Sequence, residues 1–196
     1  MIKPMKKLLL YFFGFIVLLS QTSCGYNEMV AKDENVSAKW AQVQNAYQRR
    51  ADLVPNLVNT VKGAANFEKT TLTEVIEARS RATSIQLSPE NLTPENIAKF
   101  QAAQSQLSGS LSRLLATVES YPQLRANQNF LELQAQLEGT ENRISVERMN
   151  YNGAVQDYNT YIRSFPRNIF AGWFGFQRKT PFEADPNAQR APSVQF

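Results

Sequence analysis

The sequence contains no histidine and only one cysteine among its 196 residues. Without histidine, the chain lacks the commonest general base near neutral pH and the commonest metal-binding side chain. A single cysteine excludes an internal disulfide, a Cys-X-X-Cys redox pair and a thiolate zinc site. The sequence also has no phosphate-binding loop, Gly-X-Ser-X-Gly elbow or cysteine–histidine pair. These absences remove the most familiar catalytic classes, and we expect no cofactor.

The excess of positive charge is concentrated at the N-terminus. The formal net charge is +4, from 21 Lys and Arg residues against 17 Asp and Glu residues. Lys3, Lys6 and Lys7 precede Cys24 in a segment without acid, so the rest of the chain carries 18 basic and 17 acidic residues. A nearly neutral body gives no electrostatic reason to expect a nucleic-acid partner.

Residues 1–24 have the three parts of an export signal. The lysines are followed by an uncharged run of 12 residues, Leu8–Leu19, and then by small residues before Cys24. A helix of that length spans about 18 Å, which is short of the roughly 30 Å hydrocarbon core of a bilayer. The segment is therefore typical of a secretory signal peptide rather than of a permanent transmembrane helix.

The only cysteine follows Thr22-Ser23, an arrangement that resembles the lipobox of bacterial lipoproteins, although Gln21 stands where leucine is usual. We expect residues 1–23 to be a signal peptide and Cys24 to carry acyl chains, palmitate among them, that anchor the protein in a membrane. The alternative is an incidental Cys24 beside an uncleaved anchor. The lysines before the apolar run and Asp33-Glu34 after it favour a body outside the cytoplasm, on the periplasmic side or the cell surface.

Beyond residue 25 the apolar residues recur every three or four positions, which predicts helices that each bury one seam. No stretch alternates with period two for long enough to predict a strand. We predict an all-α fold over residues 25–166, an elongated antiparallel bundle of three to four long helices. The expected helices are Glu28 to Ala82 as one helix or two collinear ones, Pro94 to Tyr121 with Thr93 as N-cap, and Phe130 to Phe165 before Pro166.

Two polar motifs interrupt the helical pattern. The first is Arg49-Arg50-Ala51-Asp52 followed by Pro55-Asn56, where the apolar spacing continues on both sides of the proline. The second is Glu141-Asn142-Arg143 in the third helical run. Since a buried charge must be paired, we interpret Arg49, Arg50 and Asp52 as partners of Glu141 and Arg143 at one level of the bundle. The functional alternative is that Arg49 and Arg50 face a partner protein or lipid phosphates.

Paired carboxylates are the only catalytic candidates. Glu74 and Glu77 are three residues apart, as are Glu138 and Glu141, so each pair shares a helix face. Such pairs can bind a metal or act as acid and base, but di-iron bundles also use histidine. A simpler interpretation is that Glu77 with Arg81, and Arg143 with Glu147, form ion pairs along wet helix faces.

The tail, residues 167–196, is first aromatic and basic and then rich in Pro, Asn and Gln. Residues 184–196 have no helical period and are expected to be extended or disordered. We expect Trp173, Phe174 and Phe176 to fold back over one end of the bundle. The alternative is that they lie in a membrane interface.

An ordered set of motifs between Gly25 and Phe196 resembles the LemA family of bacterial envelope proteins. The matching motifs are Gly25-Tyr26-Asn27, Arg49-Arg50-X-Asp52-Leu53-Val54-Pro55-Asn56-Leu57-Val58, Thr60-Val61-Lys62-Gly63, Glu77-Ala78-Arg79, Tyr121-Pro122-X-Leu124-X-Ala126-Asn127, Thr140-Glu141-Asn142-Arg143-Ile144, Tyr151-Asn152, Phe165-Pro166, Gly175-Phe176 and Pro192-X-Val194-X-Phe196. The resemblance implies an elongated antiparallel bundle on a membrane, without a defined activity. Family members commonly begin with a transmembrane helix, and here the segment resembles a lipoprotein signal instead.

Together these features favour a non-enzymatic, membrane-anchored helical bundle of the bacterial envelope that acts as a scaffold or protein-interaction module. The partners expected are a membrane, reached through the N-terminal lipid anchor, and envelope proteins whose identity the sequence does not give. Self-association into a homo-oligomer is left open. The runner-up is a carboxylate-based envelope enzyme or enzyme subunit that uses a metal.

Overall fold

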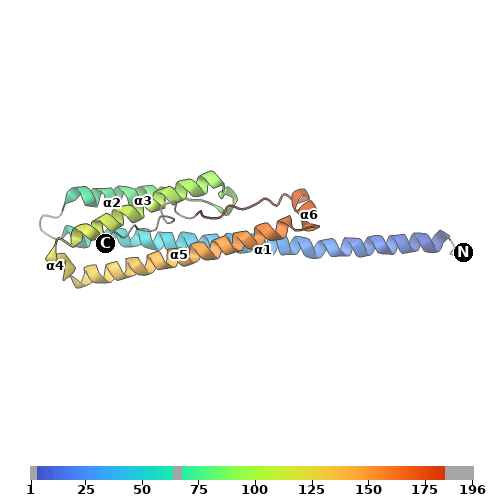
Figure 1. The fold of residues 1–196 in the computed structure, drawn as a ribbon, viewed down its shortest axis with the longest axis horizontal. Coiled ribbons are helices and arrows are strands. Elements are labelled where there is room, and N and C mark those ends of the chain that lie inside the picture. The colour runs from blue at the N-terminus through green and yellow to red at the C-terminus, as the bar shows by residue number, and fades with distance from the viewer. Residues whose placement is uncertain (1–3, 64–67, 184–196) are drawn as a thin grey trace, which may run out of the picture. The chain divides into compact units, whose positions relative to one another are not determined.

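The computed structural model describes residues 4–63 and 68–183, with side chains from residue 25 onward. All regular structure in these ranges is helical, which confirms the all-α class (Figure 1). The elements are α1 (Pro4–Lys62), α2 (Lys69–Ser84), the 3-10 turn η1 (Pro89–Asn91), α3 (Pro94–Val118), α4 (Pro122–Arg125), α5 (Gln128–Arg163) and α6 (Arg167–Trp173).

The chain forms two compact units. Unit 1 consists of residues 1–38 and 153–179, and unit 2 consists of residues 39–152 and 180–196. The helices α1 and α5 each contribute one part to unit 1 and another to unit 2. The two units are described separately below.

Unit 2 is an up-and-down arrangement of the second part of α1, then α2, α3 and the first part of α5, each antiparallel to the one before (Figure 1). Contacts along the chain follow this order, since Trp40 bonds Leu87 near the start of the unit-2 part of α1 and Arg79 bonds Ala51 further along it. The apolar seams meet in one core, made of Val54, Leu57, Val58, Val61, Leu72, Val75, Ala78, Ala82, Leu107, Leu111, Leu114, Val118, Leu124, Phe130 and Leu137.

The expectation of one helix or two collinear helices from Glu28 to Ala82 is wrong. The first helix begins at Pro4 and ends at Lys62, directly before Gly63, and α2 runs back along it (Figure 1). A glycine after a basic last turn is a common helix stop signal. Folding back buries the α2 seam against the α1 seam, and a collinear extension would leave both exposed.

Smaller boundary differences occur elsewhere. The N-cap at Thr93 is confirmed, because its side chain accepts a hydrogen bond from the Asn96 amide at 3.3 Å. However, α3 ends at Val118 rather than Tyr121, and the connection after it contains the short helix α4. The tail also contains α6, which the sequence analysis did not predict. The predicted extended or disordered end, residues 184–196, lies outside the described residues.

Pro55 lies inside α1 without ending it. Proline has no amide hydrogen, so the carbonyl oxygen of Ala51, four residues earlier, has no helical donor. The side chain of Arg79 on α2 supplies one, with Nε donating to the Ala51 oxygen at 2.7 Å. The proline thus creates a hydrogen-bonding point on a buried part of α1 (Ala51 is 3% exposed) at which α2 attaches.

This pairing predicts an energetic coupling between Pro55 and Arg79. In the native chain, Arg79→Ala should lower the free energy of unfolding by about 1–3 kcal/mol, because a buried carbonyl loses its charged donor. In a Pro55→Ala background the same change should cost less, since the amide of residue 55 can then donate to Ala51. Urea unfolding of the four variants measures the difference.

The matched control is Arg81→Ala, two residues away, because the Arg81 side chain is 57% exposed and pairs only with Glu77 at 3.4 Å. Its effect should be small and equal in both backgrounds. An Arg79→Ala effect that is also the same in both backgrounds would contradict the coupling.

Candidate functional site

The two arginines of the first motif have different environments in unit 2. Consecutive helix positions differ by about 100°, so neighbouring side chains leave α1 in different directions. Arg50 is 1% exposed and lies among α1, α3 and α5, whereas Arg49 is exposed. The candidate site therefore has a buried part around Arg50 and an open part around Arg49.

The guanidinium of Arg50 joins three helices through four hydrogen bonds. Its Nη1 donates to Glu141 Oε1 at 2.7 Å and to Ser108 Oγ at 2.5 Å. Its Nη2 donates to Gln104 at both the side-chain oxygen, 2.6 Å away, and the backbone oxygen, 3.1 Å away. Gln104 is buried and also donates to the Ala82 oxygen at 3.2 Å, which brings α2 into the network.

This buried charge lies beside Tyr47, whose ring centroid is 5.1 Å from the Arg50 guanidinium carbon. Burial raises the pKa of Tyr47 above its ordinary value, although Arg148 and Arg50 act in the opposite direction. The phenol is therefore neutral at physiological pH, and the charges at this level are those of Arg50 and Glu141. Arg50 Nε is buried and has no hydrogen-bond partner among the described residues.

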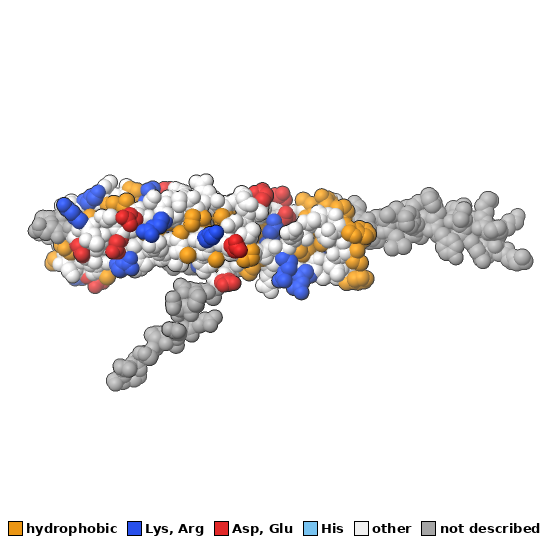
Figure 2. Space-filling model, turned by 90° about the horizontal axis from the view of Figure 1, so that it is seen from above, with side chains coloured by type: hydrophobic (Ala, Val, Ile, Leu, Met, Phe, Trp, Pro, Cys, Tyr) orange, Lys and Arg blue, Asp and Glu red, His pale blue; other side chains and the backbone are white. Residues whose placement is uncertain are grey.

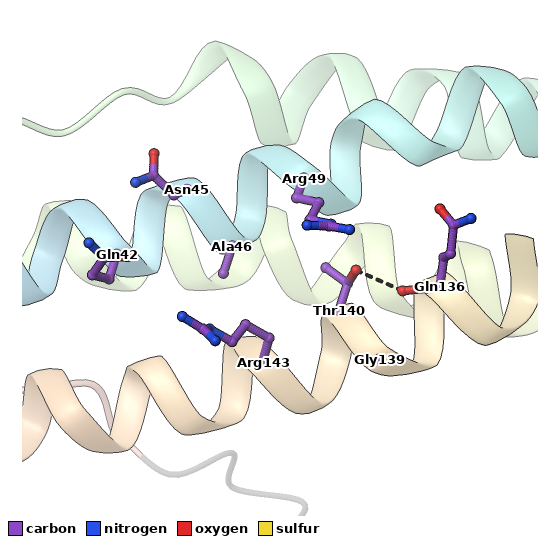
Figure 3. A pocket seen from close by; sticks show the side chains of 8 residues that line it. All are labelled: Gln42, Asn45, Ala46, Arg49, Gln136, Gly139, Thr140 and Arg143. Atoms are coloured by element: carbon purple, nitrogen blue, oxygen red, sulfur yellow. Dashed lines mark hydrogen bonds between the residues drawn. The ribbon is translucent and has the colours of Figure 1, made fainter.

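The open part is a groove of about 550 Å³ between α1 and α5. Figure 3 shows Arg49 of α1 and Arg143 of α5 extending into this space from opposite sides, with Thr140 between the helices. The remaining lining is polar or small and contains no carboxylate: Gln42, Asn45, Ala46, Gln136 and Gly139. Within the described residues, Arg49 makes no hydrogen bond or ion pair.

The structure brings together some of the predicted site residues and separates others. Arg50 and Glu141 are in contact, as the interpretation of the two motifs requires, but Asp52 and Arg143 are not part of that contact. Asp52 is exposed and accepts a hydrogen bond from Gln48 at 2.7 Å. The remaining candidates, Pro55, Asn56 and Asn142, are exposed. Cys24 lies outside the residues whose side chains are described.

The Arg143–Glu147 pair is present, with Nε and Oε1 2.7 Å apart, but its expected location on a wet face is wrong. The Glu147 side chain is only 7% exposed and also accepts a hydrogen bond from Asn150 at 3.1 Å. Arg143 thus compensates a buried carboxylate while its own side chain remains 65% exposed to the groove.

Each of the four candidate catalytic carboxylates is engaged by its own partner. Glu74 pairs with Arg113 at 3.1 Å, and Glu77 pairs with Arg81 at 3.4 Å. Glu138 accepts from Gln134 at 3.0 Å, and Glu141 belongs to the Arg50 network. Within the described residues, no three Cys, Asp or Glu side chains gather in a way that could hold a metal ion.

One structural device was missed by the sequence analysis, namely a Tyr-Asn pair on α5 that holds the tail of unit 2. Tyr151 donates to the Thr180 oxygen at 2.9 Å, and the Asn152 amide both donates to and accepts from the Phe182 backbone, at 3.1 and 2.8 Å. The Phe182 ring is buried 5.8 Å from Trp40 and 5.4 Å from Tyr151. Burial raises the pKa of Tyr151 above its ordinary value.

The same dipeptide recurs seven residues later and makes the same contacts in unit 1. Tyr158 donates to the Gln177 oxygen at 3.0 Å, and the Asn159 amide makes two bonds of 2.9 Å with the Lys179 backbone. Burial, with Asp33 acting in the same direction, raises the pKa of Tyr158 to about 12. The signal that could have revealed this device is the repeat Tyr151-Asn152 and Tyr158-Asn159 itself.

The Arg50 network predicts unequal effects for the two neighbouring arginines. Arg50→Lys should lower the free energy of unfolding by about 2–4 kcal/mol, because one ammonium group cannot replace a fork that bonds acceptors on two helices. Arg49→Lys should change it by less than about 0.5 kcal/mol, as expected for an exposed residue. Urea unfolding followed by circular dichroism measures both, and equal losses would contradict this assignment.

No helix in the described part of the chain is both long and apolar enough to count as a candidate membrane span. This observation leaves the site in unit 2 as a polar surface on a helical bundle, and comparisons with known proteins place the bundle in a family.

Curated relatives match most of this chain. Magnetosome proteins MamQ 1 and MamQ 2 of Paramagnetospirillum magneticum are each 26% identical to it over 178 residues, which cover 82% of the chain and 65% of the relative. Protein LemA of Metamycoplasma hominis is 24% identical over 145 residues, which cover 74% of the chain and 63% of that protein. The chain thus spans slightly less than two thirds of the length of the curated relatives it matches.

A family model also matches residues 39–196, a stretch that contains all of unit 2 and the part of unit 1 formed by α5 and α6. The match covers well over half of the chain and includes both arginine motifs. The resemblance found in the sequence motifs is therefore confirmed, and the chain belongs to the LemA family.

Proposed function

We propose that this protein is a non-enzymatic scaffold of the bacterial envelope, anchored to a membrane by its N-terminus, and that its helical bundle binds a partner protein. The observation that carries the proposal is the groove between α1 and α5, where Arg49 and Arg143 face a common space without a lining carboxylate. A surface built in this way is suited to recognition rather than to proton transfer or covalent chemistry.

The engagement of the candidate carboxylates supports a non-enzymatic role. General acid–base catalysis needs a pair of carboxylates directed at a common reacting atom. Glu74, Glu77, Glu138 and Glu141 instead contact four different side chains. The alternative of a carboxylate-based, metal-dependent enzyme has no comparable support from the geometry.

The chemistry of the groove defines the partner it suits. Two guanidinium groups with their faces free to solvent bind carboxylates through paired hydrogen bonds. The amides of Gln42, Asn45 and Gln136 add donors and acceptors around them. The partner we propose is an acidic segment of an envelope protein, and a second copy of this chain would qualify if it presented such a segment.

The membrane anchor is proposed on the N-terminal sequence and on the relatives. Residues 1–23 have the composition of a signal peptide, and Cys24 occupies the position of a lipid-modified cysteine. Support comes from the MamQ relatives, because a magnetosome is a membrane compartment. The body is proposed to lie outside the cytoplasm, on the side of the membrane that the signal peptide directs it to.

The groove proposal predicts contacts that depend on Arg49. A photo-crosslinking amino acid in place of Gln42, an exposed residue of the groove, should capture a partner in intact cells. Reversing one charge with Arg49→Glu should abolish that crosslink, because the groove would then repel a carboxylate. The readout is the crosslinked product on a gel, identified by mass spectrometry.

Thr73, an exposed residue of α2 outside the groove, is the matched control position. The same photo-reactive residue there should not give the Arg49-dependent product. A product at position 42 that survives Arg49→Glu, in protein with unchanged circular dichroism, would refute the groove as a docking site. A product containing two copies of this chain would identify the partner as the protein itself.

The anchor proposal predicts lipid attachment at Cys24. Cells grown with labelled palmitate should incorporate the label into the native protein and not into Cys24→Ala, because the thiol is the attachment point. The unmodified variant should also leave the membrane fraction or retain its uncleaved N-terminus. Label in the Cys24→Ala protein, with unchanged membrane retention, would exclude the lipoprotein assignment.

A further inference from the structure

Unit 1 exposes a group of large apolar side chains around α6. The exposed fractions are 82% for Phe165, 77% for Trp173, 57% for Phe174, 45% for Ile169 and 42% for Tyr26, and we call these five residues the α6 patch. Figure 2 shows hydrophobic side chains gathered over the part of the described surface where Figure 1 places α6. Soluble monomers rarely display several large aromatic residues together without a binding role.

The expectation that Trp173, Phe174 and Phe176 cover one end of the bundle is therefore wrong for two of the three residues. Phe176 is half-buried, with its ring centroid 5.8 Å from that of Tyr26. Phe174 also contacts Tyr26, at 4.9 Å, but remains mostly exposed, and Trp173 is still more exposed. The apolar surface of the tail is thus presented outward.

A defined turn holds the patch in this orientation. The Phe176 amide donates to the Ala171 oxygen at 2.9 Å, and the Gly175 amide donates to the Gly172 oxygen at 3.4 Å. These are the two bonds of a Schellman motif, which requires a left-handed residue after the helix, and Gly175 has φ of 76°. The glycine turns the chain so that Phe174 and Phe176 lie on either side of it and both contact Tyr26.

The position of Tyr26 connects the patch to the membrane anchor. Tyr26 follows Cys24 by two residues on the continuous helix α1, a rise of about 3 Å. A lipid on Cys24 would hold Tyr26 at the level of the lipid headgroups. An uncleaved helix gives a similar level, because the apolar run ends at Leu19 and Tyr26 lies about 10 Å further along the axis.

The charge around the patch is positive. The sequence between Asp157 and Glu183 contains no acidic residue, and its basic residues are Arg163, Arg167, Arg178 and Lys179. Lys179 is paired with Asp33 at 2.8 Å, whereas the three arginines are exposed and form no ion pair within the described residues. The guanidinium carbon of Arg167 lies 4.2 Å from the centre of the Tyr161 ring, which keeps this cation beside the aromatic surface.

Aromatic rings and arginines together are the side chains favoured at a bilayer interface. Tryptophan and tyrosine concentrate at the headgroup level, and arginine binds lipid phosphates. We propose that the α6 patch, with Arg163, Arg167 and Arg178, inserts into the headgroup layer of an anionic membrane. This second, non-covalent contact rests on the proposed membrane anchoring, and it would fix how unit 1 is oriented on the bilayer.

The chain has two tryptophans, which makes the proposal directly measurable. Trp40 is fully buried in unit 2, and Trp173 is in the patch. The full-length protein is reconstituted into vesicles of phosphatidylethanolamine and phosphatidylglycerol that carry a spin-labelled lipid, with the label either near the headgroup or deep in the acyl region. The Trp173 signal is the difference between the native protein and Trp173→Phe, so the core residue Trp40 is left unchanged.

The expected result is a shift of Trp173 emission to shorter wavelength and a loss of its fluorescence that is larger with the shallow label than with the deep one. Trp40, measured alone in Trp173→Phe, should lose none. Replacing Arg163, Arg167 and Arg178 by Gln should reduce the loss, and so should vesicles of neutral phosphatidylcholine. All samples are first shown to float with the vesicles.

Two results would overturn the inference. If the protein floats with the vesicles and Trp173 is neither shifted nor quenched, the patch does not touch lipid, while the proposed anchoring stands. If the native protein does not float, the proposed anchoring fails and the interface contact fails with it.

Discussion

The burial of one guanidinium group constrains the arrangement of unit 2. Arg50 is almost inaccessible to solvent, so its charge must be compensated by groups held at fixed positions. Those groups come from α3 and α5, while the next residue, Ala51, offers α2 a carbonyl that Pro55 leaves free. Two successive residues of α1 thus contact each of the other three long helices of the unit, and sliding any helix by one turn would break a charged hydrogen bond.

Sequence patterns predicted the composition of this network better than its geometry. The all-α class followed from apolar spacing, and Arg50 and Glu141 stood out as charges in helical runs. The reversal between α1 and α2 could not be predicted in the same way, because the apolar spacing is the same whether a helix continues or folds back. Ser108 and Arg79 were not singled out, since their roles depend on which helices become neighbours. The exposure of Trp173 and Phe174 likewise depends on the turn at Gly175.

The arginine motif divides structural and binding roles between adjacent residues. Arg50 holds the bundle together, and Arg49 is directed at an open groove in which no acid compensates it. A family pattern that retains both residues therefore combines two separate requirements, and only one of them concerns a partner. The tail shows a comparable division, because Phe182 is buried in unit 2 while Trp173 is presented to the surroundings of unit 1.

The asparagines on α5 hold the tail by its backbone rather than by its side chains. Seven residues of helix rise about 10 Å, and three residues of extended chain cover about the same distance. A helix with asparagine at every seventh position can therefore serve as a ruler for every third residue of an extended strand. Substitutions between Lys179 and Phe182 would leave such a ruler in register, whereas inserting or deleting one residue there would not. The tail should accordingly vary more freely in composition than in length.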